Sequence, residues 1–278
     1  MNNKIDFIKN FSETYHFSEQ MALFSAFIAC LEPVEACSLL DLQFEQEYVT
    51  RRVILKKIGR DIQAGKQECH RDLVNNLFQS FENLPYRKKQ SSAYSLAFLH
   101  DFLLENIQDE IVVFLLQSKY IGIRRKGYKK LREWKSSFTL LVEQNWKTYQ
   151  DLECAELIIE NFPIEYLEAD LGKLQEVVLG TRYLTRLYLK VAEKNLSYIE
   201  RLQAIDEITF AYVSVKTNKP FSDEQALSIF ERQKYSEKLG LLIWCFGQMK
   251  LWSVLEKINE QLEKVVYERV VAQRTKNA

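Results

Sequence analysis

Glycine and proline are scarce along the whole chain, and this scarcity limits the folds available to it. Only 8 glycines and 4 prolines stand among 278 residues, whereas these two types make up roughly 12% of an ordinary chain. β-Sandwiches and propellers need many tight turns, which depend on glycine and proline. Hydrophobic residues make up 47% of the chain, with 17 Phe, 14 Tyr and 4 Trp, so disorder is excluded as well. The composition predicts an all-α fold.

Apolar residues recur with the spacing of helices. Ile111, Phe114 and Leu115 follow the i, i+3, i+4 pattern that places side chains on one helix face. The stretches 184–191 and 254–262 repeat this pattern. Strict alternation over the length of a strand is nearly absent, which again favours helices over strands.

Two serines have the spacing of helix N-caps. Ser197 with Glu200, and Ser222 with Gln225, match the capping box. In this motif each of the two side chains accepts a hydrogen bond from an otherwise unpaired backbone N–H at the start of the helix. We therefore expect helices to begin at these serines. No long linker rich in glycine, serine or proline divides the chain, so a single domain over 1–278 is predicted.

From residue 107 onward the predicted helices form pairs. Stacked helical hairpins bury faces that a single hairpin would leave in water. We therefore predict an all-α α-solenoid of stacked antiparallel helical hairpins over 107–278, with less regular helices over 1–106 and an irregular helical bundle as the alternative. The predicted pairs are 107–118 with 122–134, 136–149 with 151–161, 164–179 with 180–194, 197–214 with 222–234, and 236–249 with 251–271.

The first of these pairs resembles a unit of the HEAT-like helical-repeat proteins. Residues 111–116 are all apolar, a tight turn follows near Gly122, and the second helix is basic, with Arg124, Arg125 and Tyr128. The resemblance covers one unit, with looser similarity over the rest of the C-terminal half. It implies a way of packing helices and names no reaction, because function must be argued from the site.

Opposite charges are separated into two adjacent segments. The formal net charge is zero, with 38 basic and 38 acidic residues. Residues 119–135, the basic segment, hold eight basic residues and one acid, which gives +7. Residues 143–176, the acidic segment, hold nine acids and two lysines, which gives −7. The neutral total therefore hides a strongly polarised region.

The basic segment is the candidate site for an anion or a partner. Guanidinium groups suit phosphate and carboxylate, and helical spacing aligns several of these side chains in stripes. Three interpretations are open: internal pairing with the acidic segment, binding of an acidic protein, and binding of nucleic acid. The candidate residues are Arg124, Arg125, Lys126, Lys129, Lys130 and Arg132.

These features suggest a non-catalytic interaction or scaffold protein that binds another protein. The alternative is a nucleic-acid-binding protein, because some HEAT-like proteins are alkylpurine DNA glycosylases with Trp, Asp and Arg around the lesion. That resemblance implies roles for Trp134, Trp146, Asp151 and Arg125. A zero net charge is unlike that of a DNA-binding domain.

No metal or cofactor is predicted. Glu13 and His16 have the i, i+3 spacing of a di-iron ligand pair, but such sites need a second pair. Cys69 and His70 are adjacent, so they diverge on a helix and cannot share a metal on one face.

No catalytic residue is predicted either. Residues 59–66 superficially resemble a phosphate-binding loop, but five residues separate the two glycines and Gln67 stands where Ser or Thr is needed. The stripe of Glu153, Glu156 and Glu160 is interpreted as a solvated acidic face.

The remaining features concern environment and packing. Five cysteines with no paired short spacing indicate buried thiols in a reducing compartment. The longest apolar stretches are about half of the roughly 20 residues that span a bilayer, so a cytoplasmic protein with no membrane partner is expected. Trp244, Phe246, Met249 and Trp252 are expected in the core, and any that are exposed would indicate a partner surface.

Overall fold

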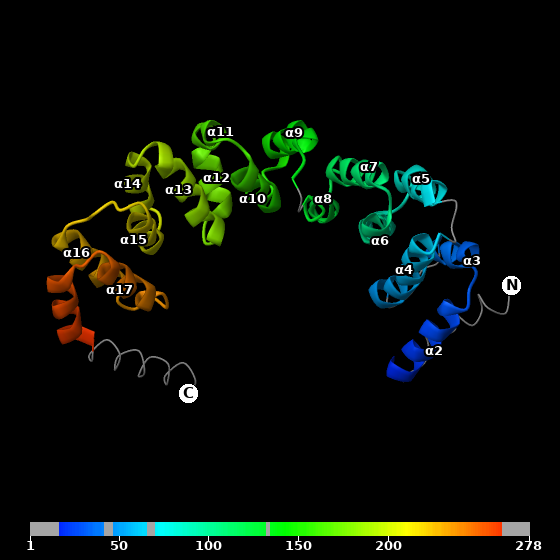
Figure 1. The fold of residues 1–278 in the computed structure, drawn as a ribbon, viewed down its shortest axis with the longest axis horizontal. Coiled ribbons are helices and arrows are strands. Elements are labelled where there is room, and N and C mark those ends of the chain that lie inside the picture. Colours follow the sequence, from blue (N-terminus) through cyan, green and yellow to red (C-terminus); the bar gives the residue numbers. More distant parts are fainter. Residues whose placement is uncertain (1–16, 42–46, 66–69, 132–133, 263–278) are drawn as a thin grey trace. The chain divides into compact units, whose positions relative to one another are not determined.

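A computed structural model describes residues 17–41, 47–65, 70–131 and 134–262 of the chain (Figure 1). Over these residues the regular secondary structure consists of α-helices and short 3-10 helices, with no strand. The predicted all-α class is confirmed. No helix in these ranges is both long enough and apolar enough to cross a membrane.

Contacts group the chain into two compact units, Met1–Glu153 (unit 1) and Cys154–Ala278 (unit 2). The boundary falls in the first turn of α10 (Leu152–Asn161). The sequence predicted one domain that becomes more regular near residue 106, and this remains a prediction.

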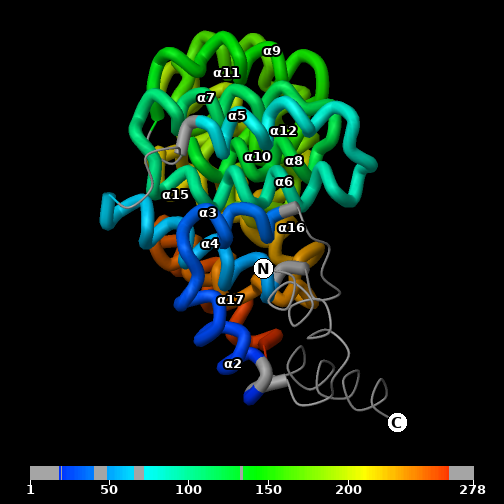
Figure 2. Tube along the Cα trace, turned by 90° about the vertical axis from the view of Figure 1, so that its right-hand side faces the viewer, coloured from blue at the N-terminus to red at the C-terminus, as the bar shows by residue number. Residues whose placement is uncertain are grey.

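Unit 1 is built from helices that pack on their neighbours and on the next helix but one. The pairs α2·α4, α4·α6, α6·α8 and α7·α9 are all in contact, as are α7 and α8. In two perpendicular views α7 and α9 lie in one layer and α6 and α8 in another (Figure 1, Figure 2). The helices are α2 (Phe17–Ala29), α3 (Pro33–Ser38), α4 (Glu47–Gln63), α5 (His70–Phe81), α6 (Tyr86–Leu99), α7 (Glu105–Leu116), α8 (Ile121–Tyr128) and α9 (Thr139–Tyr149), with 3-10 helices η2 (Leu39–Asp41), η3 (His100–Phe102) and η4 (Ser136–Phe138).

One hydrophobic core runs through this unit from Phe24 to Ile123. It includes Leu55 of α4 and Leu96 of α6, both fully buried, and is extended by the stacked rings of Phe78 and Phe114, 4.3 Å between centroids. The residues before 107, which the sequence did not assign to repeats, therefore share a core with the first predicted hairpin.

Unit 2 uses the same kind of packing. α13 contacts both α11 and α15, and α15 also contacts α17. Residues 252–262 form a further helix. The helices after α10 are α11 (Ile164–Ala169), α12 (Leu171–Val178), α13 (Arg182–Lys194), α14 (Ser197–Gln203), α15 (Glu207–Lys216), α16 (Asp223–Gln233) and α17 (Leu239–Gln248).

Two helices predicted as continuous are broken in the structure. The stretch 164–179 divides into α11 and α12 at Asp170. The stretch 197–214 divides into α14 and α15, because Asp206 caps a new helix. Its carboxylate accepts hydrogen bonds from the backbone N–H groups two and three residues further on, at 3.1 and 3.0 Å.

One of the two predicted caps is present. Ser222 accepts from the backbone N–H of Gln225 at 3.2 Å, although the Gln225 side chain donates to Gln203 at 2.8 Å instead of completing a capping box. At Ser197 the helix begins as predicted, but the predicted cap was wrong, because the N-cap residue is Leu196. Ser197 is the first helical residue, and its N–H donates to the side chain of Asn195 at 2.9 Å.

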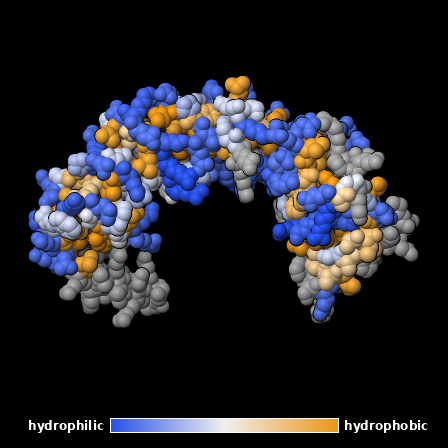
Figure 3. Space-filling view, in the orientation of Figure 1, coloured by the Kyte–Doolittle hydropathy of each residue, from blue (hydrophilic) through white to orange (hydrophobic). Residues whose placement is uncertain are grey.

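The aromatic residues near α17 divide between core and surface. Phe246 is fully buried, as expected, but 41% of Trp244 and 62% of Trp252 is exposed. Placing both tryptophans in the core was therefore wrong. In the space-filling view, hydrophobic residues of unit 2 reach the visible surface among polar ones (Figure 3).

Candidate functional site

The first half of the basic segment contains α8, which packs closely against α7. At Gly127 an added Cβ would lie 2.9 Å from Leu116 Cδ2 and 3.1 Å from Leu115 Cβ, so both leucines would have to shift to admit it. Glycine at this position therefore favours the close approach of the two helices. Helix α8 ends at Tyr128 and not at residue 134 as predicted, so Lys129, Lys130 and Lys135 lie beyond its end.

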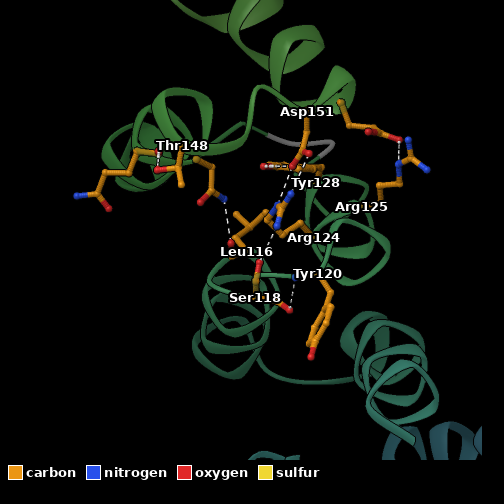
Figure 4. Close-up of polar contacts among 11 residues, drawn as sticks. Leu116, Ser118, Tyr120, Arg124, Arg125, Tyr128, Thr148 and Asp151 are labelled. Carbon is orange, nitrogen blue, oxygen red and sulfur yellow. Dashed lines mark hydrogen bonds and ion pairs between the residues drawn. The ribbon is translucent and has the colours of Figure 1, made fainter. Parts of the chain in front are cut away.

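Arg124 points into unit 1 and not toward solvent (Figure 4). Its Nε and Nη2 donate to the two carboxylate oxygens of Asp151 at 2.7 and 2.9 Å, and its Nη1 donates to the carbonyl of Ser118 at 2.9 Å. The Tyr128 hydroxyl donates to the same carboxylate at 3.2 Å. The guanidinium also lies 3.5 Å from the ring centroid of Tyr149.

Arg124 and Asp151 form a buried ion pair, and further groups bond to both partners. Only 4% of the Arg124 side chain and 3% of the Asp151 side chain is exposed. Burial alone would lower the pKa of Arg124, but the hydrogen bonds and the charge of Asp151 raise it above its ordinary value. Arg124 was predicted to bind an anion, and the anion that it binds is a carboxylate of the same chain.

Arg125, one residue further on, faces the other way and is half exposed (Figure 4). Its Nε lies 2.8 Å from Glu153 Oε1. Asp151 and Glu153 both belong to the predicted acidic segment, so internal pairing accounts for the first two arginines of the basic segment.

Other members of the acidic segment pair within unit 2. Glu160 forms an ion pair with Arg186 of α13. Lys194, at the end of the same helix, donates to Glu168 at 2.6 Å and to Glu165 at 3.4 Å. The acidic stripe is therefore partly neutralised by α13, and the interpretation as a wholly solvated face was too simple.

The lysines of α8 and the following turn have different surroundings. Lys126 is half-buried with Nζ 5.5 Å from the ring centroid of Tyr94, and burial together with the charge of Lys129 lowers its pKa. Lys129 is exposed and forms no ion pair with any residue that the structure describes. Lys130 donates to Asp101 at 2.8 Å. Arg132, the last predicted site residue, lies outside the described residues.

Three lysines of the basic segment line a cavity of about 430 Å³. They are Lys129, Lys130 and Lys135, and the carboxylates Asp101 and Asp109 also line it. Neither aspartate was among the predicted site residues. Asp101 lies in η3 and Asp109 on α7, at least 20 residues before the lysines, and the packing of α8 on α7 brings them together.

Lys135 is held by two carboxylates of α7. Its Nζ donates to Glu105 at 2.7 Å and to Asp109 at 2.8 Å. Hydrogen bonds to Asp109 and Glu105 raise the pKa of Lys135, so its ammonium stays charged throughout the neutral range.

His100 completes the polar side of the cavity. Its Nδ1 lies 2.9 Å from Asp101 Oδ1, and 12% of its side chain is exposed. Burial lowers the pKa of His100, against the raising effect of its hydrogen bond with Asp101. Burial alone would raise the pKa of Asp101, but hydrogen bonds from Lys130 and His100 bring it below its ordinary value.

The other motifs in the sequence form no site. Gly59 lies inside α4, where an added Cβ would be 3.0 Å from the ring of Phe102, so residues 59–63 are packed helix and do not form a phosphate-binding loop. Across the described ranges, no group of three or more His, Cys, Asp or Glu side chains is placed to hold a metal ion. Glu13, His16 and Cys69 lie outside these ranges.

The residues compared with DNA glycosylases are not gathered around an open pocket. Trp146 is 1% exposed in the core, and Asp151 is bound to Arg124. No family model, curated protein or solved structure matches this chain. Its function has to be argued from its own contacts.

Proposed function

We propose that this chain is a non-catalytic interaction protein, in which helical hairpins stack as a HEAT-like α-solenoid and present a surface to another protein. The contacts between alternate helices, α4·α6·α8 in unit 1 and α11·α13·α15·α17 in unit 2, support this stacking. In such repeats each hairpin buries its apolar face on its neighbours, and the outer surfaces remain available for binding.

The observation that carries the proposal is the exposure of Trp244 and Trp252. Tryptophan is among the residues most enriched at the energetic centres of protein interfaces. Trp244 stacks on Tyr212 of α15, 6.1 Å between ring centroids, and Lys216 Nζ lies 5.5 Å from the same tyrosine ring. Leu241, one turn before Trp244 on α17, is 39% exposed.

Trp244, Tyr212, Lys216 and Leu241, the tryptophan cluster, have the composition of a protein-binding surface. The rings of Trp244 and Tyr212 hold each other in place, so little side-chain entropy is lost when a partner covers them. The paired basic residues of unit 1 give weaker support to the alternative of nucleic-acid binding. Arg124, Arg125, Lys130 and Lys135 all have carboxylate partners, and DNA would have to compete with these.

Affinity capture with the double variant Trp244→Ala/Trp252→Ala tests the proposal. Wild-type protein should retain a specific partner from a lysate of its source, and the double variant should lose it while its circular dichroism shows that it remains folded. Leu140→Ser is the matched control, because Leu140 of α9 is 72% exposed in unit 1, and it should retain the partner.

Two results would count against the proposal. One is an identical set of captured proteins for wild type and the tryptophan variant. The other is tight, strongly salt-dependent binding of duplex DNA, which would favour the nucleic-acid alternative because each neutralised phosphate releases counterions.

A further inference from the structure

The cavity of unit 1 is lined by apolar side chains, called its floor below, and by charged side chains, called its rim. Val112, Leu131 and Phe138 line it and are themselves buried, with 2%, 2% and 4% exposed. A volume of about 430 Å³ lies in the range of pockets that hold small organic ligands. The floor therefore suits the apolar part of a ligand, and the rim determines the charge of the polar part.

The lysines at the rim keep hydrogen-bond donors for a ligand. An ammonium group has three protons. Lys130 uses one on Asp101 and Lys135 uses two on Glu105 and Asp109. Lys129 has no ion-pair partner among the described residues. The carboxylates hold Lys130 and Lys135 in place and leave donors of Lys129 and Lys130 available.

The rim also carries one neutral group. Because its pKa is lowered, His100 is uncharged at neutral pH, and with Nδ1–H donated to Asp101 its Nε2 is an acceptor. Asp101 pairs with Lys130, and Lys135 pairs with both Asp109 and Glu105. Lys129 is therefore the cavity cation that has no carboxylate partner among the described residues, and its charge favours an anion.

We propose that this cavity binds a phosphate monoester with an apolar body. The phosphate lies between Lys129 and Lys130, and the body covers Val112, Leu131 and Phe138. Lysine ammonium groups act as point charges and suit the tetrahedral phosphate, whereas planar carboxylates are matched better by the fork of arginine. This site is separate from the tryptophan cluster of unit 2 and does not depend on the proposed function.

Titration calorimetry of the full chain with phenyl phosphate at pH 8 tests the proposal. We expect saturable binding with a Kd of about 1 mM or tighter, since one charged contact and one small ring support affinities of this order. Phenol, which lacks the phosphate, and inorganic phosphate, which lacks the ring, should each bind at least about tenfold more weakly.

The variant Lys129→Gln/Lys130→Gln should lower the affinity for phenyl phosphate about tenfold or more, because hydrogen bonds to a charged group are lost. The matched control is Lys119→Gln/Lys147→Gln, which removes two exposed lysines elsewhere in unit 1 and should bind as wild type does. Circular dichroism should show that both variants remain folded, because none of the four lysine side chains is part of the hydrophobic core.

Four outcomes overturn the proposal. They are no saturable binding at 10 mM phenyl phosphate (about tenfold above the expected Kd), an equal loss in the control variant, equal binding of phenol, and equal binding of phenylacetate. The last outcome would show that the site does not prefer phosphate to carboxylate.

Discussion

Arg124 and Asp151 form a two-pronged ion pair inside unit 1, with Nε–Oδ2 and Nη2–Oδ1 distances of 2.7 and 2.9 Å. Removing one partner leaves a buried charge without its counter-charge. We expect Arg124→Met to lower the free energy of unfolding by about 3–5 kcal/mol. Replacing both residues, as Arg124→Met/Asp151→Leu, should restore much of this loss. Urea unfolding followed by circular dichroism measures each change.

The neighbouring arginine supplies the control for that experiment. Arg125 is half exposed in its pair with Glu153, so Arg125→Met should cost less than about 1 kcal/mol. Equal effects of the two arginine substitutions would show that the Arg124 pair does not stabilise unit 1 as a buried pair should.

Alanine substitutions at two glycines, one where α8 packs against α7 and one in open space on α17, should have opposite effects on stability. Gly127→Ala should destabilise the protein by about 1–3 kcal/mol, because Leu115 Cβ is fixed to its helix and cannot move aside. Gly240→Ala on α17 meets nothing within 4 Å, and should stabilise by up to about 1 kcal/mol through helix propensity. Melting temperatures of the two variants provide the comparison, and a stabilised Gly127→Ala would contradict the tight packing.

His100 should titrate below its ordinary value of 6.5. Burial favours the neutral ring, so the unfolded chain binds more protons than the folded chain between the two pKa values. The stability contributed by neutral His100 is therefore complete above pH 6.5 and is lost as the pH falls from 6.5 through the folded pKa. NMR titration of the ring protons, assigned with His100→Gln, measures the folded pKa.

Asp101 offers a check on the cause of this shift. Its hydrogen bond raises the pKa of His100 against the effect of burial, so Asp101→Asn should lower the pKa further. A pKa at or above 6.5 in the wild-type protein would contradict the buried, neutral imidazole.

Two cysteines should differ strongly in reactivity. Burial raises the pKa of Cys245 to about 11 from a reference of 9.0, which lowers its thiolate fraction at pH 8 about 100-fold. Cys30 is exposed. Iodoacetamide labelling with peptide mapping should modify Cys30 first in the native protein, and both residues at similar rates in guanidinium chloride. Rapid native labelling of Cys245 would place it at the surface.

Features that depend on nearby residues were predictable from the sequence. The all-α class follows from composition and periodicity, and the cap at Ser222 follows from local spacing. The break before Asp206 was also locally encoded, but continuous helical periodicity masked it. Aspartate favours an N-cap over a helix interior because its carboxylate binds the backbone N–H groups ahead of it.

Features that depend on how helices pack were not predictable. The basic segment was evident, yet its partners Asp101 and Asp109 were found only through the approach of α8 to α7. Trp244 and Phe246 are two residues apart on one helix, and only the position of the neighbouring helices decides which of them is buried. Periodicity identifies an apolar face but does not tell how much of it will be covered.

The packing of each helix on its neighbours and on the next but one has a kinetic consequence. Such contacts close short loops, and chains with mostly local contacts fold quickly. The core from Phe24 to Ile123 is contained in the first unit, and domains of a nascent chain fold as units, the N-terminal one first. Unit 1 can therefore acquire its native structure on the ribosome before the last helices of unit 2 have been synthesised.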